Sequence, residues 1–129
     1  MKMYVKSVMV DDQSKALAFY EGKLGFVVKI DIPMGKHRWL TLVSPEEPDG
    51  VELLLEPNEY PAARALQTAL MADGIPWTSF RVDDIDAEYK RLTAAGVIFK
   101  NPPTDAGDVK IATLNDTCGN FIQIIQLKE

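Results

Sequence analysis

The sequence contains few of the residues that most often do chemistry or form cross-links. Its 129 residues include one cysteine and one histidine. A single cysteine excludes an intrachain disulfide and a zinc site built from the cysteines of one chain. One histidine excludes an iron site of two histidines and a carboxylate within one chain, although a second copy could in principle contribute another. The scarcity of cysteine and histidine thus excludes two common classes of metal site within one chain.

Basic clusters and long apolar runs are also missing. The 14 Lys and Arg residues are outnumbered by 19 Asp and Glu residues, which gives a net charge of −5. No Lys/Arg cluster reaches the density of a nucleic-acid-binding surface, and an acidic chain is a poor partner for anionic membranes. The start of the chain lacks the apolar core of a signal peptide, and no apolar run approaches membrane-spanning length. We expect a cytoplasmic protein that binds neither nucleic acid nor membranes.

What the sequence does contain is a repeat. Val10-Asp11-Asp12 and Val82-Asp83-Asp84 lie 72 residues apart, and each opens a similar segment. In each copy an alternating apolar stretch comes first, then the acidic pair, a helical pattern, a glycine and further β-rich sequence. The acidic pairs precede predicted helices, so we interpret them as helix caps without a catalytic role. The repeat predicts two half-domains that meet at a cleft.

The pattern of apolar residues and turn formers predicts two βαβββ modules and a linking helix. Loops are expected at Ser44–Gly50 and Asn101–Gly107, and turns at Pro33–Gly35 and Asp116–Gly119. The predicted helices begin at Asp11 or Asp12, Pro61 and Asp84, the first with Ala16, Phe19, Tyr20 and Leu24 on one face. The predicted strands are residues 4–10, 26–32, 37–43, 51–56, 77–82, 97–100, 109–114 and 120–127.

These residues resemble a known superfamily. The run from Val10-Asp11-Asp12 through Phe19-Tyr20 to Leu24-Gly25-Phe26 is similar to the first module of the vicinal oxygen chelate superfamily. That superfamily includes glyoxalase I, bleomycin-resistance proteins, fosfomycin-resistance enzymes and extradiol dioxygenases. Asp116-Thr117-Cys118-Gly119-Asn120-Phe121 resembles its turn before the last strand. The resemblance covers essentially the whole chain and implies an α+β fold of two curled mixed sheets with a concave cleft, and a homodimer.

The resemblance also identifies four positions at which members of the superfamily bind a metal. The first-, fifth- and eighth-strand positions correspond to Val5, Trp77 and Gln123. The fourth-strand position is open between Glu52, Leu54 and Glu56. Valine has no donor atom, the indole nitrogen only donates, and a neutral amide is a weak ligand for a divalent ion. We therefore expect no catalytic metal and no other cofactor.

Strand alternation predicts which side chains face the cleft. A largely apolar, aromatic surface with a few polar anchors suits a small organic molecule, and Arg81 is available for a carboxylate or phosphate group. An equally good interpretation is that these side chains fill the cleft or bury it against another subunit. The predicted ligand-binding residues are Ser7, Trp39, Trp77, Ser79, Arg81 and Gln123.

Two glutamates on the fourth strand are the candidates for catalysis. Glu52 or Glu56 could act as a base if it lies among apolar neighbours in the cleft, whereas at a strand end it would be solvated. His37 is interpreted as a surface or pocket-edge histidine. Cys118 has no neighbouring histidine to activate it and is a poor candidate nucleophile.

The sequence thus predicts one domain over residues 1–129, with modules at about 1–58 and 75–129 and a linking helix at about 60–74. Three functions stay open. The first is metal-independent binding of a small ligand, as in the bleomycin-resistance branch. The second is a glyoxalase-like lyase or isomerase with a glutamate base. The third is a non-catalytic, dimeric interaction module.

Overall fold

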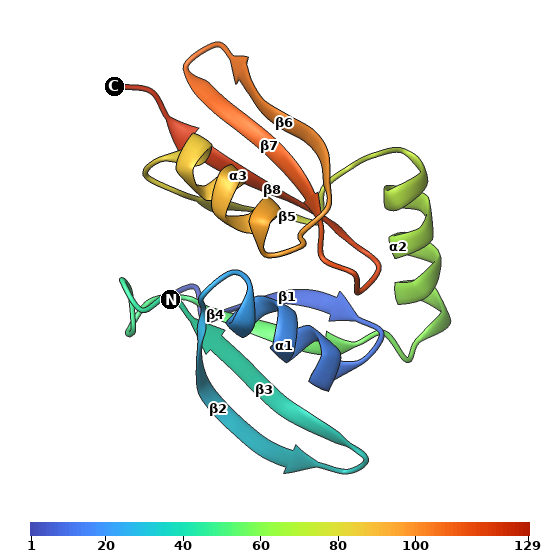
Figure 1. The fold of residues 1–129 in the computed structure, drawn as a ribbon. Helices are drawn as coiled ribbons and strands as arrows, with labels where there is room; N and C mark the ends of the chain where they lie inside the picture. Colours follow the sequence, from blue (N-terminus) through green and yellow to red (C-terminus); the bar gives the residue numbers. More distant parts are fainter. The chain divides into compact units, whose positions relative to one another are not determined.

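Each copy of the sequence repeat forms a four-stranded sheet and one helix that packs on it, in the predicted βαβββ order (Figure 1). The computed structural model describes residues 1–129, which divide into two compact units, residues 1–65 and 66–129. The first repeat forms β1 (Val5–Val10), α1 (Gln13–Gly22), β2 (Val27–Met34), β3 (His37–Val43) and β4 (Glu52–Pro57). Then come α2 (Pro61–Ala72), β5 (Thr78–Arg81), α3 (Ile85–Ala94), β6 (Phe99–Ala106), β7 (Val109–Asn115) and β8 (Phe121–Leu127).

The first unit buries one face of its sheet beneath α1. The strand order is β1-β4-β3-β2, with β1 parallel to β4 and the other pairs antiparallel. Alternation along the strands sends one set of apolar side chains toward the helix, where α1 adds Ala16, Phe19 and Tyr20. This core includes the buried strand residues Val8, Val10, Leu40, Leu42, Leu53 and Leu55.

The second unit repeats this arrangement. Its strand order is β5-β8-β7-β6, with β5 parallel to β8, and α3 packs against β6, β7 and β8. The helix buries Ile85 and Leu92, and the Tyr89 ring meets Phe99 edge to face at 4.7 Å. The three helices have 10, 12 and 10 residues, and none combines the length and apolar character needed to cross a bilayer.

The second aspartate of each acidic pair caps a helix, as predicted. The Asp12 carboxylate accepts from the Lys15 backbone N–H at 3.0 Å, and Asp84 accepts from that of Ala87 at the same distance. Each bond satisfies a backbone donor that the first helical turn leaves without a partner. Asp11 instead pairs with the Lys15 side chain at 2.7 Å.

Three predicted boundaries were wrong. The segment expected as the Asn101–Gly107 loop is the larger part of β6, and β2 continues through Pro33 to Met34, so the turn is Gly35-Lys36. Both strands lie at sheet edges, where a proline without an N–H costs no ladder bond. In β6 the register shifts between Asn101 and Thr104, across the two prolines. The first helix ends at Gly22, so Leu24 lies beyond it and is half-buried.

Candidate functional site

The first unit contains a groove at one end of β3 and β4. Its volume is about 270 Å³, which is close to the lower end of the range for small-molecule sites. Strands β2, β3 and β4 and the segment after β4 supply its lining. The lining residues are Met34, His37, Arg38, Trp39, Leu54, Leu55, Glu56, Pro57, Glu59 and Tyr60.

The groove lies where the pairing between β3 and β4 stops. Only Thr41 with Leu54 and Leu42 with Leu53 are paired between these strands. Beyond them the Gln13 side chain of α1 bridges the strands: its Nε2 donates to the carbonyls of Arg38 at 2.7 Å and Leu55 at 2.9 Å, and its Oε1 accepts from the Arg38 N–H at 3.0 Å. The Gln13 side chain thus replaces ladder bonds at Arg38 and Leu55, and it pairs these backbone groups where the two strands separate.

The walls of the groove are largely apolar. Trp39 is half-buried and shares a strand face with Thr41 and Leu54, opposite the α1 core. Its indole N–H makes no hydrogen bond within the protein. Met34 and Tyr60 are 54% and 68% exposed, a high fraction for large side chains of these types. The groove therefore presents the Trp39 indole beside exposed, largely apolar side chains.

Most charges around the groove are paired. Arg38 donates from Nε and Nη2 to Asp31 at 3.0 and 2.8 Å, and its Nη1 reaches Ser14 on the α1 side of the sheet. The hydrogen bond from Arg38 holds the pKa of Asp31 below its usual value. At the rim, Glu59 bridges Lys36 and His37, and hydrogen bonds from these two residues lower the pKa of Glu59.

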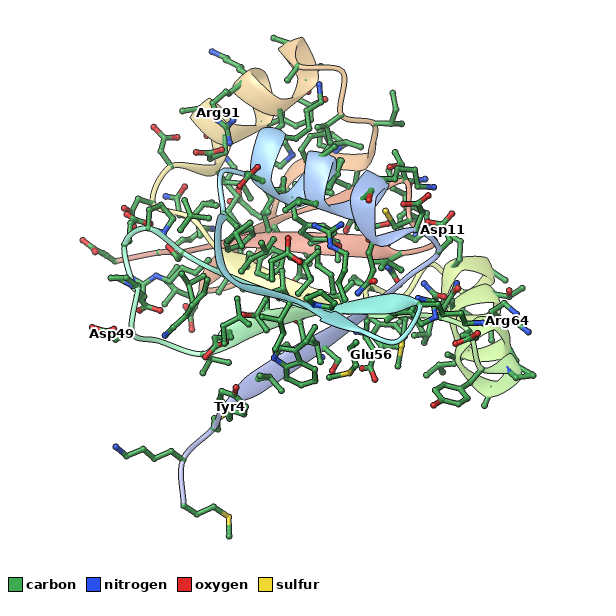
Figure 2. The ribbon with its side chains drawn as sticks, turned by 90° about the horizontal axis from the view of Figure 1, so that it is seen from below. Tyr4, Asp11, Asp49, Glu56, Arg64 and Arg91 are labelled. Atoms are coloured by element: carbon green, nitrogen blue, oxygen red, sulfur yellow. The ribbon has the colours of Figure 1, made fainter.

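The two candidate glutamates have different surroundings. Glu52 is buried, its carboxylate accepts from the Thr41 hydroxyl at 2.8 Å, and the Lys29 ammonium lies 3.8 Å away. Glu56 lines the groove on the face of the sheet turned away from α1 (Figure 2), is half-buried, and its carboxylate has no hydrogen bond or ion pair. Of the two, Glu56 is the carboxylate that a molecule in the groove could contact.

The remaining predicted ligand-binding residues lie outside this groove. Ser7 pairs in register with Leu54 from the neighbouring strand β1. In the second unit the Ser79 hydroxyl donates to Gln123 Oε1 at 2.8 Å, and Arg81 is exposed on the same strand face. Trp77 lies beside β5 and lines a depression with essentially no free volume, together with Phe121 and residues of α2. A role in ligand binding stays a prediction for all of them.

The strand registers identify the fourth metal position that the sequence left open. Ser79 pairs with Gln123 in the second unit, and the equivalent Ser7 pairs with Leu54 in the first. Leu54 is therefore the counterpart of Gln123, which leaves valine, leucine, tryptophan and glutamine at the four positions. These side chains do not fit a divalent ion, and neither unit gathers three or more His, Cys, Asp or Glu side chains elsewhere.

Sequence reasoning missed several residues of the site. Met34 was predicted in a turn and Tyr60 lies between β4 and α2, so neither carried a strand-face signal. Gln13 was only a polar residue in a predicted helix. Gln13 is 9% exposed although it is polar and lies in the first helical turn. Its burial depends on which strands separate, and that information is absent from local periodicity.

Comparison with known proteins gives consistent matches over the whole chain. A sequence model of the Glyoxalase/Bleomycin resistance protein/Dioxygenase superfamily matches residues 4–124. The uncharacterized protein YurT of Bacillus subtilis (strain 168) is 56% identical over 126 residues, covering 98% of this chain and 99% of YurT. The crystal structure of UcmS2 is 32% identical with a TM-score of 0.82 and covers 97% of each chain. TnmS3, described as an antibiotic binding protein from Streptomyces sp. CB03234, is 27% identical with a TM-score of 0.79, covering 99% of this chain and 97% of TnmS3.

Proposed function

Because the chain belongs to the glyoxalase/bleomycin resistance protein/dioxygenase superfamily, we propose that it binds a small organic molecule in the groove of the first unit without a catalytic metal. The observation that carries this proposal is the half-buried Trp39 indole in an open, largely apolar groove. When a flat molecule displaces water from an aromatic surface and the apolar side chains beside it, the free energy of the complex falls.

Two further observations support a binder. The metal positions of the superfamily hold side chains that are poor ligands, so chemistry that needs the ion has no site here. TnmS3, which shares the fold over nearly the full length, is described as an antibiotic binding protein. A binder of this kind acts by sequestering its compound.

A thermal-shift screen of planar aromatic compounds tests the proposal. A ligand present at 100 times its Kd stabilises the native state by about 2.7 kcal/mol. For a chain of this length that corresponds to a rise in Tm of roughly 10 °C. The Trp39→Ala variant removes the aromatic surface, so we expect it to lose most of the rise.

The matched control is Ile98→Ala, which truncates a 69% exposed side chain in the second unit. This variant should keep the full ligand-dependent rise. A compound that raises the Tm of both variants equally binds elsewhere and contradicts the proposed groove. Silence across the whole aromatic library contradicts the proposal itself.

A lyase or isomerase is the second candidate, because Glu56 is an unpaired carboxylate within the groove and could accept a proton. Mass spectrometry of each hit after prolonged incubation separates the two. A binder returns the compound unchanged, whereas an isomerase or lyase returns a product that Glu56→Gln fails to form. The homodimer and the cytoplasmic location stay predictions.

A further inference from the structure

One charge in the groove has no partner in the protein. Four lining residues carry acidic or basic side chains: His37, Arg38, Glu56 and Glu59. Arg38 is held by Asp31, and its guanidinium reaches toward α1. Glu59 is bridged by Lys36 and His37. The Glu56 carboxylate is left as the uncompensated charge of the groove.

A purely apolar ligand would bury the charge of Glu56 without giving it a partner, which is unfavourable. Glu56 is half-buried in the free protein and pairs in register with Met9 of β1. A molecule lying on Trp39 and Leu54 would remove more water from the carboxylate. Loss of water from an ionised group is costly unless a donor replaces it, and an anionic ligand would add repulsion.

We infer that the preferred ligand carries a protonated amine on a planar aromatic body, with the amine directed to Glu56 and the ring against Trp39. The inference rests on the proposed function and specifies its ligand class. An ammonium group offers three donors to the free carboxylate oxygens, and the ion pair forms beside apolar side chains, where water screens it less. The indole face of Trp39 also attracts a cation close to it.

Three probes that differ in one group test this inference: 1-naphthylmethylamine, 1-naphthylmethanol and 1-naphthoic acid. Their dissociation constants are measured by calorimetry at pH 7 and low salt. We expect the amine to bind about tenfold more tightly than the alcohol, which is the factor that one charge-assisted hydrogen bond provides. The acid should bind most weakly. Added salt should narrow the difference between amine and alcohol.

The variant Glu56→Gln keeps the shape of the side chain and removes its charge. It should bring the affinity for the amine to that for the alcohol, which itself should not change. Glu21→Gln is the matched control: it changes the net charge equally, at an exposed position of α1 without an ion pair. This control should keep the tenfold preference. An unchanged Tm without ligand verifies that each variant is folded.

The outcomes separate the two proposals. If the alcohol binds and needs Trp39 but the amine gains nothing, the charge preference is wrong and the groove remains. Equal losses of amine affinity in both glutamine variants would mean that only net charge matters, which also contradicts the inference. If none of the three probes binds, the aromatic groove and the ligand class are both wrong.

Discussion

Glu52 and Glu56 show how two identical side chains on one strand face acquire different roles. Strand alternation places both on the face opposite α1, four residues apart. Glu52 lies where β3 and β4 remain close together, so the Thr41 hydroxyl and the Lys29 ammonium reach it. Glu56 lies beyond the last residues that are paired between β3 and β4, and no side-chain donor reaches its carboxylate there. The end of the ladder therefore makes one carboxylate structural and leaves the other available to a ligand.

This difference predicts unequal effects on stability. Glu52→Ala removes a buried acceptor and leaves the Thr41 hydroxyl without its partner, so the free energy of unfolding should fall by about 1–3 kcal/mol. Glu56→Ala removes no side-chain hydrogen bond or ion pair and should change the free energy of unfolding by less than about 0.5 kcal/mol. Urea unfolding of both variants measures this. Equal destabilisation would mean that Glu56 also has a structural role.

At the scale of elements, a buried carboxylate organises the turn between β7 and β8. Asp116 is fully buried, and its Oδ1 accepts from the N–H groups of Cys118 at 2.7 Å and Asn120 at 3.0 Å. Its Oδ2 accepts from the Asn120 side-chain amide at 2.8 Å. Gln67 of α2 then donates to Asn120 Oδ1 at 3.0 Å and to the Cys118 carbonyl at 3.3 Å. The turn thus attaches the C-terminal half of α2 to the second unit.

The roles of hydrogen-bond donor and acceptor can be exchanged between the side chains at positions 116 and 120. Asp116→Asn replaces the carboxylate oxygen that accepts from the Asn120 amide with a second amide donor. The free energy of unfolding should fall by about 1–3 kcal/mol. Asn120→Asp places two carboxylates together and should cost at least as much. The double variant reverses the donor and acceptor, still accepts from Gln67, and should recover most of the loss. Simple addition of the two single losses in urea unfolding would contradict the network.

Sequence patterns predicted the elements better than their ends. Amphipathic periodicity and the capping aspartates identified the helices because both signals are local. Most of β6, residues 101–106, was predicted as a loop, although its beginning was predicted as a strand. Pro102 and Pro103 usually break a strand, and only the edge position of β6 in the sheet makes them acceptable. The groove followed even less from the sequence. Trp39 and Glu56 were identified as candidates by strand parity, but the separation of β3 from β4 depends on Gln13, which lies on a different element.

At the scale of the whole chain, acidic side chains are in excess, and in both units some of them form ion pairs with basic side chains. In the first unit a hydrogen bond from Arg38 lowers the pKa of Asp31. Hydrogen bonds from Lys36, which has the larger effect, and from His37 lower the pKa of Glu59. In the second unit a hydrogen bond from Lys128 lowers the pKa of Asp105. In each case the native state releases its proton more readily than the unfolded chain, whose carboxyl groups keep usual pKa values of 3.8 for Asp and 4.5 for Glu.

The sign of the pH dependence follows from these shifts. Where a folded pKa lies below the unfolded one, the stabilisation is fully present above the unfolded value and is lost as the pH falls through the folded value. We therefore expect the urea midpoint to be constant from pH 7 to about 5 and to fall progressively below about pH 4.5. Because the pairs are exposed, 0.5 M salt should reduce this fall. Asp105→Asn removes one contributor and should flatten the acid limb, whereas Asp49→Asn, a loop position without an ion pair, should follow the wild-type curve. A midpoint that stays constant down to pH 3.5 would mean that these carboxylates have the same proton affinity in the folded and unfolded chain.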